Sequence, residues 1–172
     1  MELSFSLATE PDAAELAALH TAAAEDLTLR FGLGFWSSSR TEKSVLLDLS
    51  RPQFSRVLTA RNGGKIAGTL RLATKKPWAI DTTYFTPVVR PLYLTGMAVH
   101  PAFQRRGVGR RLMKKAEALA KNWPGDAIWL DAFDAAAGAG DFYLKCGMRE
   151  VAHVVYKSDP LVYFERVLGG IL

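Results

Sequence analysis

The chain has 172 residues, of which 49% are hydrophobic and 23% are charged. This length suits one packed domain and is short for two, and the apolar content argues against global disorder. No apolar run reaches the roughly 18 residues that a membrane-spanning helix needs, and the N-terminus lacks the pattern of a signal peptide. The single cysteine, Cys146, cannot form an intramolecular disulfide and fits a reducing compartment. We therefore expect one domain over residues 1–172, cytoplasmic and independent of a membrane.

The formal net charge of +5 suits a nucleic acid, an anionic cofactor or solubility alone. Arginines gather at positions 105, 106, 110 and 111, with Lys114 and Lys115 close behind. On a helix, the later members of this set also fall where a solvated face would place them. No nucleic-acid recognition motif accompanies the basic residues, so we rank a nucleic-acid binder last among the functional classes and expect no nucleic-acid partner.

The first half of the chain begins with a short strand, Leu3 to Leu7, and an amphipathic helix, Pro11 to Leu27, for which Thr9 is a candidate N-cap. Glycines and aromatics in residues 31–36 interrupt that helix. Further along the chain we predict a second helix, a hairpin about Asn62-Gly63-Gly64 and a long proline-containing loop. Their ranges are Thr41 to Leu49 for the helix, Arg56 to Arg61 and Lys65 to Ala73 for the two strands, and Lys75 to Pro91 for the loop.

The second half alternates more regularly between the periods of strands and helices. We predict strands over Leu92 to Val99, Ile128 to Phe133, Met148 to Tyr156 and Leu161 to Val167, and helices over 108–122 and Ala139 to Lys145. Gly147 is the expected C-terminal stop of the second of these helices. The whole pattern predicts a single mixed α/β domain with a partly antiparallel sheet.

The run from Gln104 to Arg111 is the most informative stretch of the sequence. It follows a predicted strand, turns after Pro101 and opens a helix, and its two glycines, Gly107 and Gly109, remove Cβ atoms where a ligand could approach the backbone. N–H groups at a helix N-terminus beside arginines form a site for a phosphate-bearing ligand. Gly96 lies within the preceding strand, where it marks either a bulge or a tolerated glycine.

Three motifs together resemble the GNAT superfamily of N-acetyltransferases. They are Met97-Ala98-Val99-His100-Pro101, the pattern Gln104-x-x-Gly107-x-Gly109, and the run from Asp141 to Met148. The resemblance is specific over about residues 92–150 and concerns only the order of elements elsewhere. It implies a single-domain fold in which helices flank a mixed sheet, and acetyl-CoA in a V-shaped gap between two splayed central strands.

The resemblance also implies roles for individual residues. The backbone of Met97, Ala98 and Val99 would pair with the pantetheine arm, and the pyrophosphate would be bound by Gln104, Arg105, Arg106, Gly107, Val108, Gly109 and Arg110. These assignments agree with the chemistry, because coenzyme A combines several phosphate charges with an extended, amide-rich arm. An N–H group of this region could also stabilise the oxyanion formed as the amine attacks.

Tyr143 is the candidate general acid, because in the resembling family the tyrosine at this position often protonates the departing thiolate. A phenol of pKa about 10 has a proton available at pH 7; the alternative is that Tyr143, like Phe142, is a core aromatic. One position departs from the family, since Ala136 stands where many members carry an asparagine that contacts the arm. Asp134 could replace it, backbone could hold the arm alone, or the small residues could pack tightly on the cofactor.

The acceptor half of the reaction is less determined. Asp131 and Asp81 are candidates for the general base, each with a structural role as the alternative, and His100 is expected to hold a turn. We expect no metal, because the histidines lack ligand spacing, and Cys146 reads as a packed residue. Aromatic residues of the variable segments could form the acceptor pocket or belong to the core: residues 31–36, Trp78, Tyr84 and Phe85.

These observations favour an acetyl-CoA-dependent N-acetyltransferase that acts on a small or amino-acid-like primary amine. A protein N-terminus or lysine is the second choice of acceptor. A non-catalytic acyl-CoA sensor is the alternative to an enzyme. Either could act as a monomer or as a homodimer.

Overall fold

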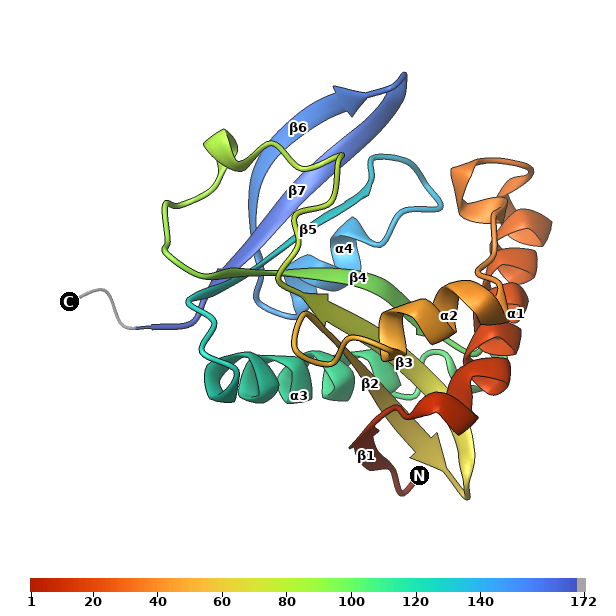
Figure 1. The fold of residues 1–172 in the computed structure, drawn as a ribbon. Coiled ribbons are helices and arrows are strands. Elements are labelled where there is room, and N and C mark those ends of the chain that lie inside the picture. Colours follow the sequence, from red (N-terminus) through yellow and green to blue (C-terminus); the bar gives the residue numbers. More distant parts are fainter. Residues whose placement is uncertain (170–172) are drawn as a thin grey trace. The chain divides into compact units, whose positions relative to one another are not determined.

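The computed structural model describes residues 1–169, whose helices and strands are labelled in Figure 1. Strands and helices follow one another as β1 (Ser4–Leu7), α1 (Ala13–Phe31), α2 (Glu42–Leu49), β2 (Ser55–Asn62), β3 (Lys65–Ala73), β4 (Pro91–Val99), α3 (Val108–Asn122), β5 (Ala127–Phe133), α4 (Gly140–Lys145), β6 (Arg149–Tyr156) and β7 (Asp159–Val167). Four single-turn 3-10 helices lie between them: η1 (Glu10–Asp12), η2 (Phe35–Ser37), η3 (Thr82–Tyr84) and η4 (Pro101–Phe103).

The strands form a seven-stranded sheet in the order β1-β2-β3-β4-β5-β7-β6. Pairing is antiparallel between β1 and β2, β5 and β7, and β6 and β7, and it is parallel between β4 and β5. The parallel register joins Pro91, Leu92 and Tyr93 to Ala127, Ile128 and Trp129. The predicted fold class, a mixed α/β fold with a partly antiparallel sheet, is therefore confirmed.

The chain divides into two compact units, and β4 contributes to both. The first unit contains Met1–Leu72 and Thr95–Ala116, and the second contains Ala73–Leu94 with the residues from Glu117 onward. The prediction of one domain over residues 1–172 stays a prediction.

The first unit has its core between α1, α2 and the strands β2 and β3. Leu16, Leu19, Val45, Val57 and Ile66 are buried in this cluster, and α1 and α2 lie side by side (red and orange in Figure 1). Burial of such side chains is the main favourable contribution to folding. The core thereby fixes α1 and α2 on the strands that lead to the predicted cofactor segment.

Close packing also fixes the start of α3 on this unit. A Cβ atom on Gly68 of β3 would lie 2.9 Å from Leu112 Cδ1 and 3.0 Å from Val108 Cγ1. A larger residue at this position would therefore force the ends of these two side chains to move, so a glycine suits β3 where it contacts α3. The N-terminus of α3 is consequently held at a fixed position relative to the strand.

The second unit has a core rich in aromatic residues. Phe85 stacks on Trp129 and on Tyr163, with ring centroids 4.5 and 5.2 Å apart, and Tyr93 meets Trp129 edge to face. The long loop before β4 thus packs its own side chain into the sheet. β6 and β7 form a long hairpin (blue in Figure 1) with a bulge between Glu150 and Ala152.

The predicted elements are present with small shifts of their ends. The largest concerns α1, which runs on from the predicted end at Leu27 to Phe31. It ends where Gly32 adopts a φ of +80°, a left-handed conformation that glycine accepts without strain. Thr9 caps η1, one turn before α1, and Thr41 caps α2 by accepting a hydrogen bond from the Ser44 N–H.

Candidate functional site

The second half of β4 contains a glycine in a conformation that ordinary strand residues avoid. Gly96 has a φ of +59°, a left-handed conformation, which favours the irregular backbone over the tolerated glycine, the two alternatives left open by the sequence. The next residues, Met97, Ala98 and Val99, are all half-buried. Just beyond the strand, the His100 N–H donates to the Ala67 carbonyl over 2.9 Å. The strand is therefore anchored on one side by β3 while it carries the three residues predicted to pair with the pantetheine arm.

Gln104 closes the turn that follows β4. Its side-chain amide donates to the Val99 carbonyl over 3.3 Å, and His100 Nδ1 accepts a hydrogen bond from the Ala102 N–H over 3.1 Å. The expected role of His100 in holding a turn is thereby confirmed. Gln104 itself ties the turn to the strand, so its position at the head of the motif has a structural reason.

The turn between Gln104 and α3 presents its backbone to the outside. Arg105 and Gly107 both have left-handed φ values, +59° and +79°, and a Cβ atom on Gly107 would meet nothing within 4 Å. Arg105, Arg106 and Arg110 are exposed, and none of them forms an ion pair with another described residue. Unpaired guanidinium groups beside open backbone and a helix N-terminus are suited to bind phosphate oxygens.

The first turn of α3 separates buried residues from exposed ones. Val108 is buried and packs against the strand, so its contribution to an anion site would come from its backbone N–H alone. Arg111, the fourth arginine of the run, lies over the ring of Phe5 in β1 at 5.3 Å, and Lys115 lies over the same ring at 5.4 Å. These cation–π contacts give Arg111 and Lys115 a structural role.

Tyr143 lies in α4, within the second unit. Its side chain is buried, with 5% of its surface exposed, and its ring packs against those of Phe164 and Phe142. Burial, and then the negative charges of Asp131 and Cys146, raise the pKa of the Tyr143 phenol far above its ordinary value of 10.0. No described residue hydrogen-bonds its hydroxyl. The phenol therefore keeps its proton at neutral pH.

The two candidate bases differ in their surroundings. Burial raises the pKa of Asp131 in β5 above its ordinary value, which brings the carboxylate closer to the range of a general base. Asp81 is exposed and caps η3, where it accepts hydrogen bonds from the Thr83 N–H and hydroxyl at 3.0 and 2.7 Å. This geometry assigns Asp81 the structural role.

The loop between β5 and α4 borders a cavity of about 220 Å³ in the second unit, to which Ala136 contributes. Asp134, considered as a replacement for the missing asparagine, hydrogen-bonds His153 Nδ1 over 2.8 Å, and Glu150 meets the other ring nitrogen over 2.6 Å. These two hydrogen bonds raise the pKa of His153 above its ordinary value. The Asp134 carboxylate thus links the end of β5 to β6.

The aromatic residues considered for the acceptor pocket fall into two groups. Phe85 is buried in the core of the second unit, so for this ring the core reading is correct. Trp78, Tyr84 and Phe35 are exposed over at least half of their surface.

A cluster of charged side chains that the sequence analysis did not single out lies in the first unit. Asp48 of α2 forms ion pairs with Arg40 and with Arg71 of β3, the latter over 3.3 Å. Arg71 also donates to the hydroxyls of Ser55 and Thr95, over 2.7 and 3.2 Å. His20 of α1 completes the group, and burial together with Arg40 lowers its pKa to about 4 despite the opposing effect of Asp48. No sequence motif marks these positions, because they are joined only by tertiary contacts.

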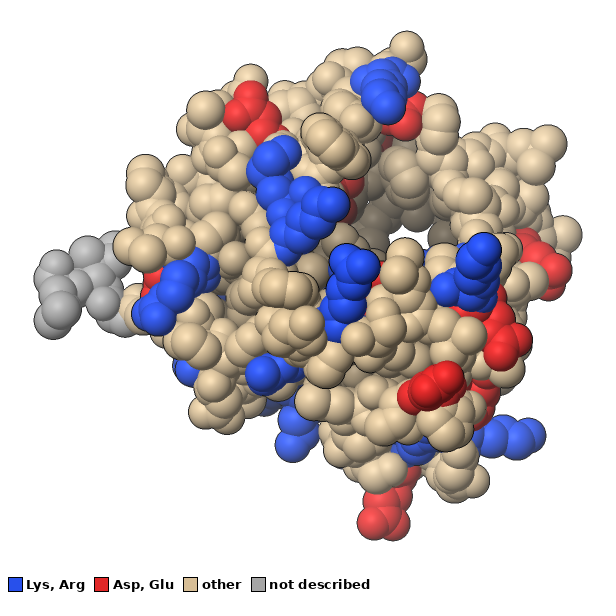
Figure 2. Space-filling view, in the orientation of Figure 1, with Lys and Arg blue, Asp and Glu red and all other residues tan. Residues whose placement is uncertain are grey.

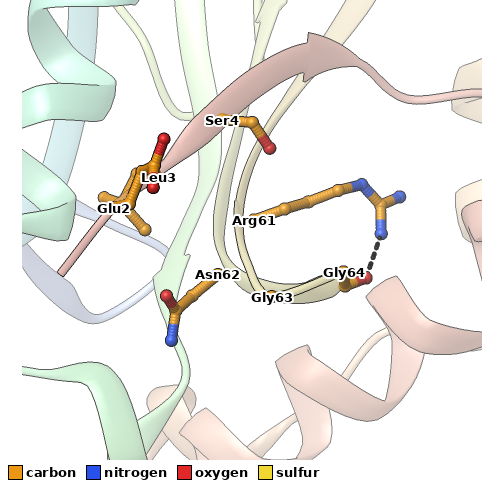
Figure 3. Close-up of a pocket in the computed structure, with 7 residues that line it drawn as sticks. All are labelled: Glu2, Leu3, Ser4, Arg61, Asn62, Gly63 and Gly64. Atoms are coloured by element: carbon orange, nitrogen blue, oxygen red, sulfur yellow. Dashed lines mark hydrogen bonds between the residues drawn. The ribbon is translucent and has the colours of Figure 1, made fainter.

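Another cavity of the first unit, of about 500 Å³, lies between β1 and the hairpin of β2 and β3 (Figure 3). Its arginine, Arg61, donates to the Gly64 carbonyl over 3.0 Å, and it pairs with Asp12 and Glu15. Two carboxylates therefore neutralise this guanidinium, and none of the predicted site residues lines the cavity. On the face that Figure 2 draws, Lys and Arg side chains form separate groups, several of them beside Asp or Glu.

Comparison with models of known protein families gives a match over most of the chain. A model of the Acetyltransferase (GNAT) family matches residues 17–148, more than half of the chain. The chain belongs to this family, and it is therefore an acetyltransferase by class. No described helix is long and apolar enough to cross a membrane.

Similar proteins extend this result. GCN5-related N-acetyltransferase 4, chloroplastic, of Arabidopsis thaliana is 42% identical over 59 residues, which are 34% of this chain and only 20% of that protein. One similar solved structure is that of yncA from Salmonella typhimurium, a putative acetyltransferase with its cofactor acetyl-CoA. It has a TM-score of 0.73 at 16% identity, and the match covers 98% of this chain and 95% of the yncA chain. The PaiA N-acetyltransferase of Thermoplasma acidophilum in complex with coenzyme A has a TM-score of 0.71 at 15% identity, with 95% and 98% covered. At these identities the solved structures share the fold.

Proposed function

We propose that this protein binds acetyl-CoA at the turn between β4 and α3 and transfers the acetyl group to a primary amine. The observation that carries the proposal is the open, left-handed backbone at Arg105 and Gly107 beside three exposed arginines without ion-pair partners. This turn lies within the stretch that matches the family. The acetyl-CoA and coenzyme A complexes of the similar folds support the same ligand.

Different residues of the first unit bind different parts of acetyl-CoA. Backbone N–H groups of the turn and of the first residues of α3 donate to the pyrophosphate, and Arg105, Arg106 and Arg110 neutralise its charge. The half-buried backbone of Met97 to Val99 pairs with the amide groups of the pantetheine arm, as an added strand would. An N–H group of this segment polarises the thioester carbonyl and stabilises the oxyanion.

In the transfer itself, the amine nitrogen forms a bond to the thioester carbon and the carbon–sulfur bond breaks. We propose that the Tyr143 hydroxyl donates its proton to the departing sulfur. Because the pKa of Tyr143 is raised well above the value of about 8.5 typical of a thiol, complete proton transfer is uphill. The amine attacks in its neutral form, and the proton that its nitrogen loses as the amide forms has to return to the phenol, through water or a base such as Asp131.

Acetyl-CoA incubated with a broad amine panel, followed by mass spectrometry and a free-thiol assay, tests this proposal. The panel contains small amines, amino acids, and peptides with free N-termini or lysines. We expect an acetylated small amine together with an equal amount of free thiol. Binding of acetyl-CoA without thiol release from any amine would instead identify a sensor, and acetylation confined to peptides would assign a protein substrate.

A further inference from the structure

The cluster of Arg40, Asp48 and Arg71 leaves the guanidinium group of Arg40 with few partners. Arg71 contacts three residues through its Nε and Nη1 atoms: Asp48, Ser55 and Thr95. Arg40 has a single ion-pair partner among the described residues, Asp48, which it shares with Arg71. A guanidinium carries five N–H donors in a planar fork, so most donors of Arg40 have no acceptor among residues 1–169.

Arg40 faces the irregular part of β4. A Cβ atom on Gly96 would lie 3.5 Å from Arg40 Nη1 and 3.8 Å from His20 Cε1, which are ordinary contact distances. Both side chains therefore lie directly beside the backbone at Gly96. Met97 to Val99, the segment proposed to pair with the pantetheine arm, begins at the next residue.

The cluster carries an excess of positive charge. Two guanidinium groups share one carboxylate, and His20 is neutral near pH 7 because burial and Arg40 lower its pKa to about 4. Burial also lowers the pKa of Arg71, with Asp48 acting in the opposite direction. Arg40 and Arg71 are only 31% and 24% exposed, and Asp48 only 13%. A half-buried excess charge is costly without a counter-ion, so this position favours an anionic group and disfavours an ammonium ion without one.

We propose that the acceptor is an amine that carries a carboxylate, a small amino acid, and that Arg40 binds this carboxylate beside Gly96. The inference rests on the proposed acetyl transfer and names its substrate class. The carboxylate forms charge-assisted hydrogen bonds with the free donors of Arg40, and it completes the charge balance of the cluster. The amine of the same molecule is thereby held near the strand that would carry the thioester.

Matched acceptors test the proposal on the unmodified protein. Each amino acid is compared with its amide, which lacks the carboxylate charge. The α-amino group of the amide resembles a chain terminus, with a pKa of about 8, and is more often unprotonated than that of the free amino acid. Intrinsic reactivity at pH 7 therefore favours the amide. We expect kcat/KM to favour the free amino acid at least tenfold nevertheless, and a preference for the amide would overturn the proposal.

Variants locate the interaction. Arg40→Gln should raise KM for amino acids about tenfold, the loss expected for one charge-assisted contact, and should leave KM for the amides unchanged. Arg40→Lys, which keeps the charge but not the fork, should recover part of this loss. Arg30→Gln serves as the control, because Arg30 is exposed at the end of α1 and pairs with Asp26. Equal effects of Arg40→Gln on amino acids and amides would show a merely structural role and overturn the assignment.

Binding of the reaction product separates this inference from the proposed function. N-acetylated amino acids should bind the unmodified protein in calorimetry and bind Arg40→Gln at least tenfold more weakly, whereas N-acetylated amino acid amides should not discriminate. If the protein transfers no acetyl group but shows this pattern, the carboxylate site stands and the proposed transfer fails. If the protein acetylates amines without preferring those that carry a carboxylate, the proposed transfer stands and the carboxylate site fails.

Discussion

Thr86 binds the carboxylate of Glu165 with both of its donors. Its N–H reaches Oε2 over 2.8 Å and its hydroxyl reaches Oε1 over 2.7 Å, while Arg149 pairs with the same carboxylate. Glu165 of β7 is only 2% exposed. A nearly buried charge is tolerated because these partners hydrogen-bond it, and the contact anchors the loop before β4 to β7.

Thr86→Val should therefore destabilise the protein by about 1–3 kcal/mol, since it removes the hydroxyl donor to a buried carboxylate. Urea denaturation measures the loss, with Thr83→Val as a control because the N–H and hydroxyl of Thr83 donate to the exposed Asp81.

Burial raises the pKa of Glu165, but the hydrogen bonds from Thr86 and Arg149 outweigh this effect and lower the pKa below 4.5. The contribution of Glu165 is therefore complete above pH 4.5 and is lost as the pH falls through the lowered value. An equal loss of unfolding free energy in Thr86→Val and Thr83→Val would contradict this role of Glu165.

Gly107→Glu should abolish binding of acetyl-CoA, because it adds a side chain and a negative charge at the proposed pyrophosphate site. Gly63→Glu is a matched control: Gly63 also has a positive φ, +55°, and open space around its Cβ position, but it lies in the hairpin of β2 and β3. Both variants carry the same backbone strain and the same charge change. Calorimetry with acetyl-CoA should separate them, and equal affinities would refute the site.

Tyr143→Phe should lower kcat about 10²-fold or more, the usual contribution of a positioned acid, with little change in the affinity for acetyl-CoA. The ring contacts with Phe164 and Phe142 remain in this variant, and no described residue hydrogen-bonds the hydroxyl. The fold should therefore be unaffected in thermal melting. Tyr156→Phe in β6 provides the control, and an unchanged kcat for Tyr143→Phe would remove Tyr143 from the mechanism.

The pKa values of the His20 and His153 imidazoles should depart from the ordinary value of 6.5 in opposite directions. NMR should find a pKa of about 4 for His20 and a pKa above the ordinary value for His153. Between pH 6.5 and 4 the His20 imidazole binds a proton in the unfolded chain but stays neutral in the folded one. The free energy of unfolding is therefore unaffected by His20 above pH 6.5 and falls as the pH drops toward 4, by an amount on the order of 2 kcal/mol. His153 contributes in the opposite sense, below pH 6.5. His20→Gln should flatten the first dependence, and a His20 pKa near 6.5 would show that the ring is solvated.

Asp48→Asn should lower the free energy of unfolding by about 2 kcal/mol or more, because Arg40 and Arg71 would lose the carboxylate that they share. Glu25→Gln, an exposed change on α1, should be nearly neutral. Chemical denaturation measures both. A neutral result for Asp48→Asn would mean that water already screens the two guanidinium groups.

Local patterns predicted the helices and strands because each depends on neighbours in the sequence. The apolar strand Ile128 to Phe133 and the hairpin about the glycine pair after Asn62 appear where the residues predicted them. The turn at Gly107 could be predicted for the same reason. The pairing of Asp48 with Arg71 could not, since it depends on how α2 packs on β3. The roles of Phe85 and Arg111 also required the structure, because an aromatic ring or an arginine has the same local pattern in a core as in a binding site.

The division of the chain into two compact units has a consequence for expression of fragments. Each unit is assembled from two separate stretches of sequence, since Ala73–Leu94 is inserted into one and Thr95–Ala116 into the other. No single truncation can therefore isolate either unit with all its parts. A fragment that ends at Leu94 would lack Gly96, the glycine turn and the start of α3 together. A fragment that begins at Thr95 would lack α1, α2 and the strands on which α3 packs. Studies of donor binding consequently require the intact chain or a rearranged gene that rejoins the separated stretches.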